Sequence, residues 1–399
     1  MTKVVYCGGQ ADISTKEKIR RILTKLGGLS KIVRPGNTVL IKPNFVAPFF
    51  HAVTSFEILE ALVQEIRQCG GRPIIGESSG FEFDTETTFN VLGAYEFACR
   101  NQVELVNFDN CDFTTVQLQH GLVKEVKIPS MVQEADVLIN VPKLKRHSLT
   151  KVTIGSKNLF GLLARESRRK IHSLGLERGI WELARTIKSD IVIVDGTVIT
   201  DRAVYGAQKK LGLIIGGLDV YSVDMFCCQF LNINYRDVGH LRLALEKGPA
   251  QEKYKVISIG QKDEEICPSP PATSQQKFLS EILSRFAYQV MYFADILYSL
   301  IRRRKSLIPW IHFYFGIRPK LDSDKCTECG MCLSACPVQA IRISQRRIVA
   351  SLCMPVRCLR CIQACPESAI NIRGRGTSYH PSKMYNGKNY DACPTVESK

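Results

Sequence analysis

Short apolar runs alternate with amphipathic segments along residues 1 to about 260. The runs are rich in valine, isoleucine and leucine, and their length suits buried strands. They lie at Val4–Cys7, Thr38–Lys42, Pro73–Gly76, Glu104–Asn107, Val137–Val141, Ile191–Val194, Leu211–Ile215 and Tyr254–Ile259. Strands that alternate with helices in this way are typical of an α/β domain with a mostly parallel sheet.

Between these runs, apolar residues recur every three or four positions, which predicts helices. The predicted helices are Thr15–Leu26, Ser55–Cys69, Thr87–Arg100, Leu176–Ile187 and Val220–Phe230. Thr54 or Ser55 suits the N-cap of the second helix. Residues Thr114–Lys127 alternate apolar and polar positions instead, which predicts an antiparallel hairpin.

The pattern changes after residue 262, and prolines cluster in Pro268–Ser274 as at a domain boundary. Residues 263–317 are predicted to form a linker with an aromatic-rich, amphipathic helical segment. Nine of the thirty residues from 286 to 315 are aromatic, and the run Arg302–Lys305 is basic.

The apolar half of this segment, residues 286–301, is too short and too polar for a transmembrane helix. Two alternatives remain for residues 286–316. Their aromatic side chains pack between domains, or they touch a membrane surface while the basic run meets anionic head groups.

Two copies of one short unit lie within residues 318–375. A shift of 29 positions superimposes the Cys-x2-Cys-x3-Cys-Pro run that begins at Cys329 on the run that begins at Cys358. Residues 376–399 are rich in Gly, Ser, Asn and Lys and are predicted to be a tail.

Composition excludes intrinsic disorder and collagen-like structure, because 45% of residues are hydrophobic and 23% are charged. The formal net charge is +16, and residues 301–399 hold 17 basic but only 6 acidic residues. Such a charge suggests nucleic acid or an anionic membrane. However, eight of the sixteen cysteines lie in the same quarter, between Cys326 and Cys365. Metal-bound thiolates there would offset much of the excess, so we do not expect nucleic-acid binding.

The first residues lack the apolar run of a signal peptide. We therefore expect a cytoplasmic protein, with a peripheral location at the inner face of the membrane as the alternative. In a reducing compartment, many cysteines indicate metal ligation instead of a disulfide framework.

The most specific motif is Cys326-x2-Cys329-x2-Cys332-x3-Cys336-Pro337, which has the spacing of a bacterial ferredoxin. Three closely spaced thiolates can hold one corner each of a 4Fe-4S cluster, and the fourth points to a second cluster. Zinc ribbons and buried structural cysteines are the alternatives, but neither needs the Cys-Pro ending.

Residues 318–375 resemble the two-cluster bacterial-type ferredoxin domain, a small α+β fold. The resemblance implies two 4Fe-4S clusters whose fourth ligands are exchanged between the two copies. Its ligands would be Cys326, Cys329, Cys332 and Cys365 for one cluster, and Cys336, Cys353, Cys358 and Cys361 for the other. Cys353 is the irregular ligand, because Pro355 stands at the position expected for a cysteine.

Residues 1–262 resemble the domain of unknown function 362, which often accompanies such ferredoxin modules. The resemblance rests on short motifs in the family's order, and the family has no general assigned reaction. The motifs are Leu40–Asn44, Gly76–Ser78, Asp136–Lys145, Gly155–Gly161, Asp195–Gly196, and Asp219 with Asp224.

Polar residues from these motifs follow predicted strands, and ligands bind at the carboxyl ends of strands in open α/β sheets. Converging cations would suit a small carboxylate or phosphate. The predicted catalytic residues are Lys42, Glu77, Lys143 and Asp195. The predicted substrate-binding residues are Asn44, Lys145, His147, Lys157 and Asn158. Alternatively, Lys143, Lys145 and Arg146 are a solvated charge run and His147 is structural.

Two other readings have less support. Gly76-Glu77-Ser78-Ser79-Gly80 fits the nucleophile-elbow pattern, but no helix follows Ser78 directly and no Asp-then-His order follows. The sequence contains neither a G-x-G-x-x-G fingerprint nor a P-loop.

The sequence therefore predicts an iron-sulfur oxidoreductase. In it, two 4Fe-4S clusters exchange electrons with a small anion bound in the N-terminal domain and with a redox partner protein. The alternative is a non-catalytic electron-transfer or docking subunit of a larger redox system.

Overall fold

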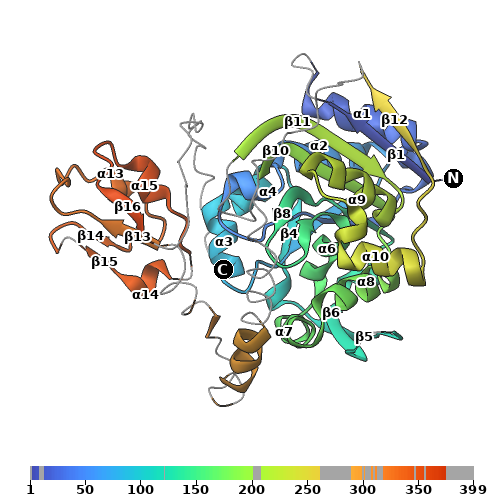
Figure 1. Cartoon of the computed structure of the whole chain (residues 1–399). Coiled ribbons are helices and arrows are strands. Elements are labelled where there is room, and N and C mark those ends of the chain that lie inside the picture. The colour runs from blue at the N-terminus through green and yellow to red at the C-terminus, as the bar shows by residue number, and fades with distance from the viewer. Residues whose placement is uncertain are drawn as a thin grey trace.

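The computed structural model describes residues 2–8, 13–120, 122–200, 208–260, 289–298, 301, 307–308, 311, 318–345, 347–354 and 356–373. The expected boundary at Pro268–Ser274 and the expected tail lie outside these residues. A large sheet covered by helices forms the N-terminal part, and a small module of short strands and helices contains the C-terminal cysteines (Figure 1).

The large sheet has ten strands and is mostly parallel. Its strands are β1 (Thr2–Cys7), β2 (Thr38–Lys42), β3 (Arg72–Glu77), β4 (Glu104–Asn107), β7 (Val137–Asn140), β8 (Lys143–His147), β9 (Lys151–Thr153), β10 (Ile191–Thr200), β11 (Gln208–Gly217) and β12 (Tyr254–Ile259). The order is β12-β1-β11-β10-β7-β2-β3-β4, and β8 pairs with β10 and β9. Within the described strands of this sheet, only the pairings made by β11 and that of β9 with β8 are antiparallel. The α/β class and all eight predicted strands are confirmed, whereas β8 and β9 were not predicted.

Helices cover both faces of this sheet, because its central strands bury side chains on both sides. Val39 and Ile41 pack in one cluster with α1 and α2, whereas Leu40 packs in the other with α8 and α9. The helices are α1 (Thr15–Leu26), α2 (Phe56–Gln68), α3 (Thr85–Leu92), α4 (Ala94–Arg100), α5 (Met131–Glu134), α6 (Gly155–Asn158), α7 (Arg165–Leu174), α8 (Leu176–Thr186), α9 (Val220–Cys228) and α10 (Gly239–Lys247).

Local signals explain several of these boundaries. Ser55 is the N-cap of α2, and its hydroxyl accepts a hydrogen bond from the Glu57 N–H. The predicted helix Thr87–Arg100 is two helices, because Gly93 has a left-handed φ of 69° and interrupts it. The predicted hairpin is confirmed as β5 (Phe113–Gln117) paired antiparallel with β6 (Glu125–Pro129).

The C-terminal module shows the internal repeat in three dimensions. β13 (Arg318–Leu321) pairs with β16 (Ile370–Arg373), and β14 (Ile341–Arg342) pairs with β15 (Arg347–Ile348). The helices are α13 (Met331–Ser334), α14 (Ala350–Cys353) and α15 (Arg360–Ala364). Its core consists of Cys332, Ile341, Cys361 and Ile370, which are two pairs of residues 29 positions apart.

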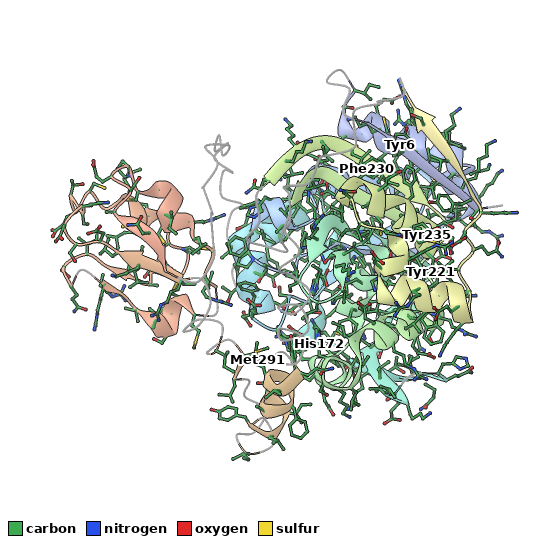
Figure 2. All side chains as sticks on the ribbon, in the orientation of Figure 1. Tyr6, His172, Tyr221, Phe230, Tyr235 and Met291 are labelled. Carbon is green, nitrogen blue, oxygen red and sulfur yellow. The ribbon has the colours of Figure 1, made fainter. Side chains whose placement is uncertain are left out.

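A helical segment at residues 289–298 packs against the N-terminal part beside α7 (Figure 1). The Tyr292 ring stacks on His172 with centroids 4.3 Å apart, and Asp295 lies 2.9 Å from the Arg169 guanidinium. Figure 2 labels His172 and its neighbour Met291 at this contact. None of the helices in the described part of the chain is both long and apolar enough to cross a membrane.

Candidate functional site

Three adjacent parallel strands end in polar residues that meet at one edge of the sheet. Lys42 ends β2, Glu77 ends β3 and Asn140 ends β7, and Lys42 is in register with Asn140. The Lys42 ammonium lies 2.7 Å from a Glu77 carboxylate oxygen, and both side chains are almost completely buried. Burial lowers the pKa of Lys42, although Glu77 opposes the shift.

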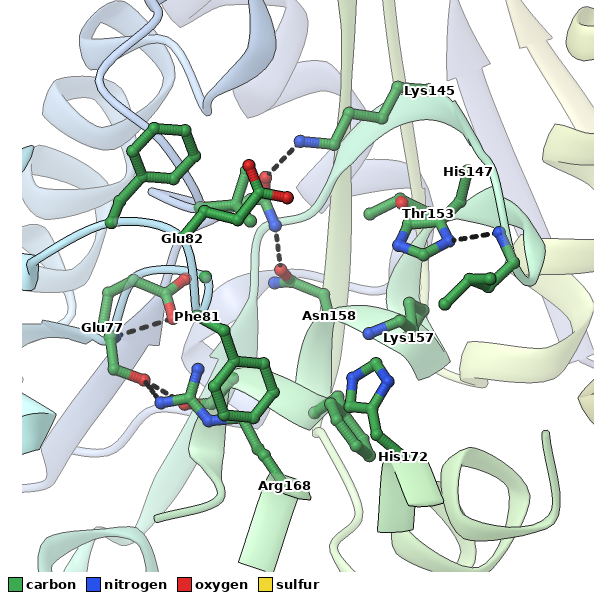
Figure 3. Close-up of a pocket in the computed structure, with 18 of the residues that line it drawn as sticks. Glu77, Phe81, Glu82, Lys145, His147, Thr153, Lys157, Asn158, Arg168 and His172 are labelled. Atoms are coloured by element: carbon green, nitrogen blue, oxygen red, sulfur yellow. Dashed lines mark hydrogen bonds between the residues drawn. The ribbon is translucent and has the colours of Figure 1, made fainter. Parts of the chain in front are cut away.

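A cavity of about 190 Å³ opens at these strand ends (Figure 3). Seven of the nine predicted N-terminal site residues line it: Lys42, Asn44, Glu77, Lys145, His147, Lys157 and Asn158. The other lining residues used below are Ser78, Phe81, Glu82, Phe83, Phe160, Gly161, Arg168, His172 and Tyr292.

A chain of side-chain amides positions one lysine at the wall of this pocket. The Lys145 ammonium donates to the Asn44 side-chain oxygen at 2.8 Å and to the Ala52 carbonyl at 2.6 Å. The Asn44 amide donates to Asn158 at 2.8 Å, and the Asn158 amide donates to Asn140 at 2.8 Å. These hydrogen bonds hold the Lys145 ammonium in position, and none of their acceptors is a carboxylate.

Cations outnumber carboxylates in the pocket lining. Burial lowers the pKa of Lys145 to about 7, with Lys143 as the next contributor. Burial and Arg168 lower the pKa of Lys157 to about 7, and burial and Arg165 lower that of Arg168 to about 10. Crowded buried cations destabilise their own charged forms, so an anion in the pocket would relieve the repulsion.

His147 presents an N–H to this pocket. Its Nδ1 atom accepts hydrogen bonds from the backbone N–H groups of Leu149 and Thr150 at 3.1 and 3.3 Å. Burial and the nearby Lys157 hold its pKa well below the ordinary value, so the ring is neutral at pH 7. A neutral ring whose Nδ1 accepts must carry its proton on Nε2, which faces the pocket in Figure 3.

Aromatic rings form the opposite wall. His172 packs edge-on against Phe81 and Phe160, with centroids 5.5 and 5.2 Å away, and stacks on Tyr292. The Lys157 ammonium lies 4.3 Å from the Phe160 ring centre. The pocket therefore offers cationic groups to one end of a small molecule and apolar rings to the other.

Lys143 and Asp195 lie outside the pocket lining and pair with each other. Their charged atoms are 3.0 Å apart, and their side chains are 2% and 0% exposed. Asp224 and Asp219, the last two aspartates of the motifs, accept hydrogen bonds from the backbone. Asp224 accepts from the N–H groups of Gly155 and Ser156, and Asp219 is the N-cap of α9.

Ser78 lacks the neighbours of a nucleophile. Its hydroxyl donates to the Gly161 carbonyl at 2.7 Å and accepts from Arg168 at 2.6 Å. A guanidinium stabilises a hydroxyl oxygen but does not take its proton, so Ser78 connects Arg168 to the pocket wall.

The cysteines of the C-terminal module line two cavities. Cys326, Cys329, Cys332 and Cys365 line the first, and Cys336, Cys353, Cys358 and Cys361 line the second. These sets are the two ligand sets that the ferredoxin resemblance implies. Four thiols around one space match what a 4Fe-4S cluster requires, so the residues present fit that group.

Backbone N–H groups repeat the same contact in both halves of the module. The Ala340 N–H donates to Cys336 Sγ at 3.2 Å, and the Ala369 N–H donates to Cys365 Sγ at 3.2 Å. Hydrogen bonds to thiolate sulfur stabilise the negative charge of a cluster and raise its reduction potential.

Several pocket residues were not predicted from the sequence. Arg168 lies in α7, where Ile171 and Leu174 are the only apolar residues and give no helical pattern. Phe81, Glu82 and Phe83 come from a loop, and Tyr292 comes from the segment that was predicted to pack between domains or on a membrane. The aromatic content of residues 286–315 was the only sequence signal for any of them.

Comparison with known proteins places these features in families. Residues 39–229 match the family model "Domain of unknown function (DUF362)", and residues 319–342 match "4Fe-4S binding domain". The chain thus contains one region that matches the DUF362 model and one that matches the 4Fe-4S binding domain model. The resemblances to DUF362 and to a 4Fe-4S ferredoxin-type domain are thereby confirmed, and the 4Fe-4S domain supports an iron-sulfur electron-transfer role. The 4Fe-4S match covers the first cysteine repeat, so the second cluster stays a prediction.

Two relatives give further context for the DUF362 region. A thylakoid-associated protein of Synechocystis sp. is 27% identical over 237 residues, which cover 54% of this chain and 70% of that protein. The lactate racemase apoprotein of Thermoanaerobacterium thermosaccharolyticum is 14% identical with a TM-score of 0.42. That match covers 59% of this chain and 57% of the racemase chain, and we base no argument on it.

Proposed function

We propose that this protein is an iron-sulfur oxidoreductase with two 4Fe-4S clusters and one small-anion site. The clusters occupy the two cysteine cavities, and the anion is a small carboxylate or phosphate in the pocket of the DUF362 domain. A redox partner protein exchanges electrons with the clusters. Lys143 and Asp195 then support the site from below, while Lys145, Lys157, His147 and Arg168 face the anion.

One observation carries this proposal: the second cysteine cavity adjoins the wall of the pocket. Leu359, which lines that cavity, is buried in a cluster with Phe49 and Phe83 of the DUF362 domain. Phe83 also lines the pocket. Side chains that line the second cysteine cavity thus contact a side chain that lines the pocket.

Within the site, each group has a distinct role. The lysines and Arg168 bind the anion, and the neutral His147 donates one hydrogen bond from Nε2. Lys145, with its pKa of about 7, can exchange a proton with the bound molecule at neutral pH. The aromatic wall excludes water from the end of the molecule that lies away from the cations.

The test uses anaerobically purified protein with full iron content. Rapid mixing of reduced protein with a panel of small carboxylates and phosphate esters should identify a compound that reoxidises the clusters. Lys157→Gln should weaken that reaction by at least tenfold at unchanged iron content, whereas the exposed Lys188→Gln should not. Failure of every compound in the panel to change the cluster absorbance would favour the docking-subunit alternative.

We also propose a peripheral location at an anionic membrane surface through residues 286–316. One face of the helix at 289–298 is docked, but Val290, Phe293 and Leu297 on the other face are 52%, 59% and 48% exposed. The only charged residue of this helix, Asp295, lies on the docked face, and the basic run Arg302–Lys305 follows in the sequence. An apolar face next to basic residues suits an interfacial helix, and one relative is named as thylakoid-associated.

Flotation with vesicles tests this location. Wild-type protein should float with vesicles that contain anionic lipid and should stay behind with neutral vesicles. Phe293→Glu should abolish flotation, whereas Leu218→Glu, at another exposed apolar residue, should not. Absence of wild-type binding to anionic vesicles at low salt would leave the helix as a packing element only.

A further inference from the structure

The second cysteine repeat is longer than the first by two residues. The first repeat has Cys326-x2-Cys329, whereas the second has Cys353-x4-Cys358. Both repeats share a left-handed backbone at the second cysteine, with φ values of 58° and 78° at Glu328 and Gly330 and of 40° and 58° at Arg357 and Leu359. Only the loop length differs, and the longer loop of the second repeat makes contacts outside the cysteine module.

Those contacts are with the DUF362 domain. The Arg357 guanidinium lies 3.1 Å from a Glu82 carboxylate oxygen and 5.2 Å from the Phe83 ring centre. The next arginine, Arg360, donates to the Val91 carbonyl at 2.8 Å. The lengthened loop therefore attaches the cysteine module to the domain that contains the pocket.

Arg357 borders both sites at once. It lines the second cysteine cavity together with all four of its thiols, and it is only 1% exposed. Its partner Glu82 and the ring beneath it, Phe83, line the pocket. The described residues that line the first cysteine cavity have no such link. None of them lines the pocket, and none is Glu82 or Phe83, the two residues that Arg357 contacts.

We propose that Arg357 couples anion binding in the pocket to reduction of the cluster held by the second cysteine set. This inference rests on the proposed function. Reduction adds one electron, and hence one negative charge, to the cluster beside Arg357. An anion in the pocket adds negative charge on the other side of the same buried guanidinium, where solvent screens little.

The sign of the coupling follows from these charges. The negative charge of the bound anion partly offsets the positive charge of Arg357. One-electron reduction of the second cluster is then less favourable, so the reduction potential of that cluster falls. By reciprocity, reduction of that cluster weakens anion binding by the same factor. The first cluster should respond much less, because none of the described residues that line its cavity is an arginine.

Potentiometric titration monitored by electron paramagnetic resonance tests this coupling. The potential is set by an electrode with mediators, and inorganic phosphate is the probe. Cys353→Ala identifies the signal of the second cluster. If phosphate binds tenfold more weakly to the reduced protein, saturating phosphate should lower the potential of that cluster by about 59 mV.

Variants of Arg357 distinguish a role in the coupling from a role that is limited to attaching the cysteine module to the DUF362 domain. Arg357→Gln should abolish the phosphate-dependent shift, and Arg357→Lys, which keeps the charge, should retain most of it. Arg342→Gln is the matched control, because Arg342 is an exposed arginine of the same module. An unchanged shift in Arg357→Gln would overturn the role of Arg357.

A second measurement distinguishes the failure of this inference from that of the proposed function. Calorimetric titration reports phosphate binding to the oxidised protein directly. Phosphate binding without any shift in the second potential would overturn the coupling and leave the proposed function standing. Absence of clusters, or absence of binding of both phosphate and the small carboxylates of the panel, would overturn both.

Discussion

The Lys143 ammonium lies 3.0 Å from a carboxylate oxygen of Asp195 in a buried ion pair. Asp195 also accepts hydrogen bonds from the backbone N–H groups of Ser55 and Thr197. The pair thus connects β8, β10 and the N-terminal end of α2 beneath the pocket. Lys145, two residues further along β8, faces the pocket without a carboxylate partner.

Removal of one member of this pair should destabilise the fold strongly. Lys143→Met leaves Asp195 as an unpaired buried charge, which costs about 3–5 kcal/mol of unfolding free energy. The double variant with Asp195→Leu should recover part of the loss, since no charge then remains unpaired. Urea unfolding followed by circular dichroism measures both. A loss below about 1 kcal/mol in Lys143→Met would show that the pair does not stabilise the fold.

Gly161 leaves room for the ion pair of the pocket. A Cβ atom at this position would lie 2.6 Å from Glu77 Oε1 and 2.8 Å from Lys42 Nζ. Gly161→Ala should therefore cost about 1–3 kcal/mol of stability, as overpacking does, and should weaken anion binding. In a Glu77→Ala background the same change should cost less. Equal costs in both backgrounds would mean that Gly161 does not act through Glu77.

Anion binding should depend on pH through two lysines. The pKa values of Lys145 and Lys157 lie near 7, below their ordinary value of 10.5. Both side chains therefore lose their charge as pH rises through 7. The affinity for sulfate, whose own charge is constant in this range, should fall roughly tenfold or more between pH 6 and 8.5.

Stability should follow the opposite trend over part of this range. The unfolded chain keeps both lysines protonated above pH 7, whereas the folded chain releases the protons. The unfolding free energy should therefore rise from pH 7 to about 8.5, where cysteines begin to titrate. Calorimetry and urea unfolding in matched buffers measure the two effects, and a sulfate affinity that is constant with pH would contradict the lysine assignment.

Sequence periodicity predicted the sheet but not all of the site. Runs such as Thr38–Lys42 are apolar because both faces of the strand are buried, so the eight predicted strands were visible. β8 was not predicted, because the charged residues of Lys143–His147 are typical of a solvent-exposed segment. Its lysines are nevertheless buried, since one pairs with Asp195 and the other is bonded to Asn44.

Motifs predicted the residues at the strand ends, because parallel strands bring their carboxyl ends to one edge. That principle does not predict Arg168 or Phe83, which come from a polar helix and a loop. Nor does it distinguish Lys143 from Lys145, which depends on side-chain partners. The role of Arg357, in the longer loop before Cys358, could be inferred only from its contacts with Glu82 and Phe83.

Cys353 is the irregular member of the second cysteine set and stays a prediction as a ligand. Cys353→Ala should leave one intact cluster and convert or lose the other, so the iron content should fall from about eight per chain to between four and seven. Its cluster should also be the more oxygen-sensitive in the wild type. Iron and sulfide analysis under anaerobic conditions measures this. About eight irons and unchanged spectra in the variant would exclude Cys353.

Anomalous X-ray scattering at the iron edge, from anaerobically grown crystals, tests the central claim most directly. The account predicts two separate groups of four irons. One should lie among Cys326, Cys329, Cys332 and Cys365, and the other among Cys336, Cys353, Cys358 and Cys361 beside Arg357. A single group of irons would contradict the account. So would a second group that does not contact the loop that packs on Phe83.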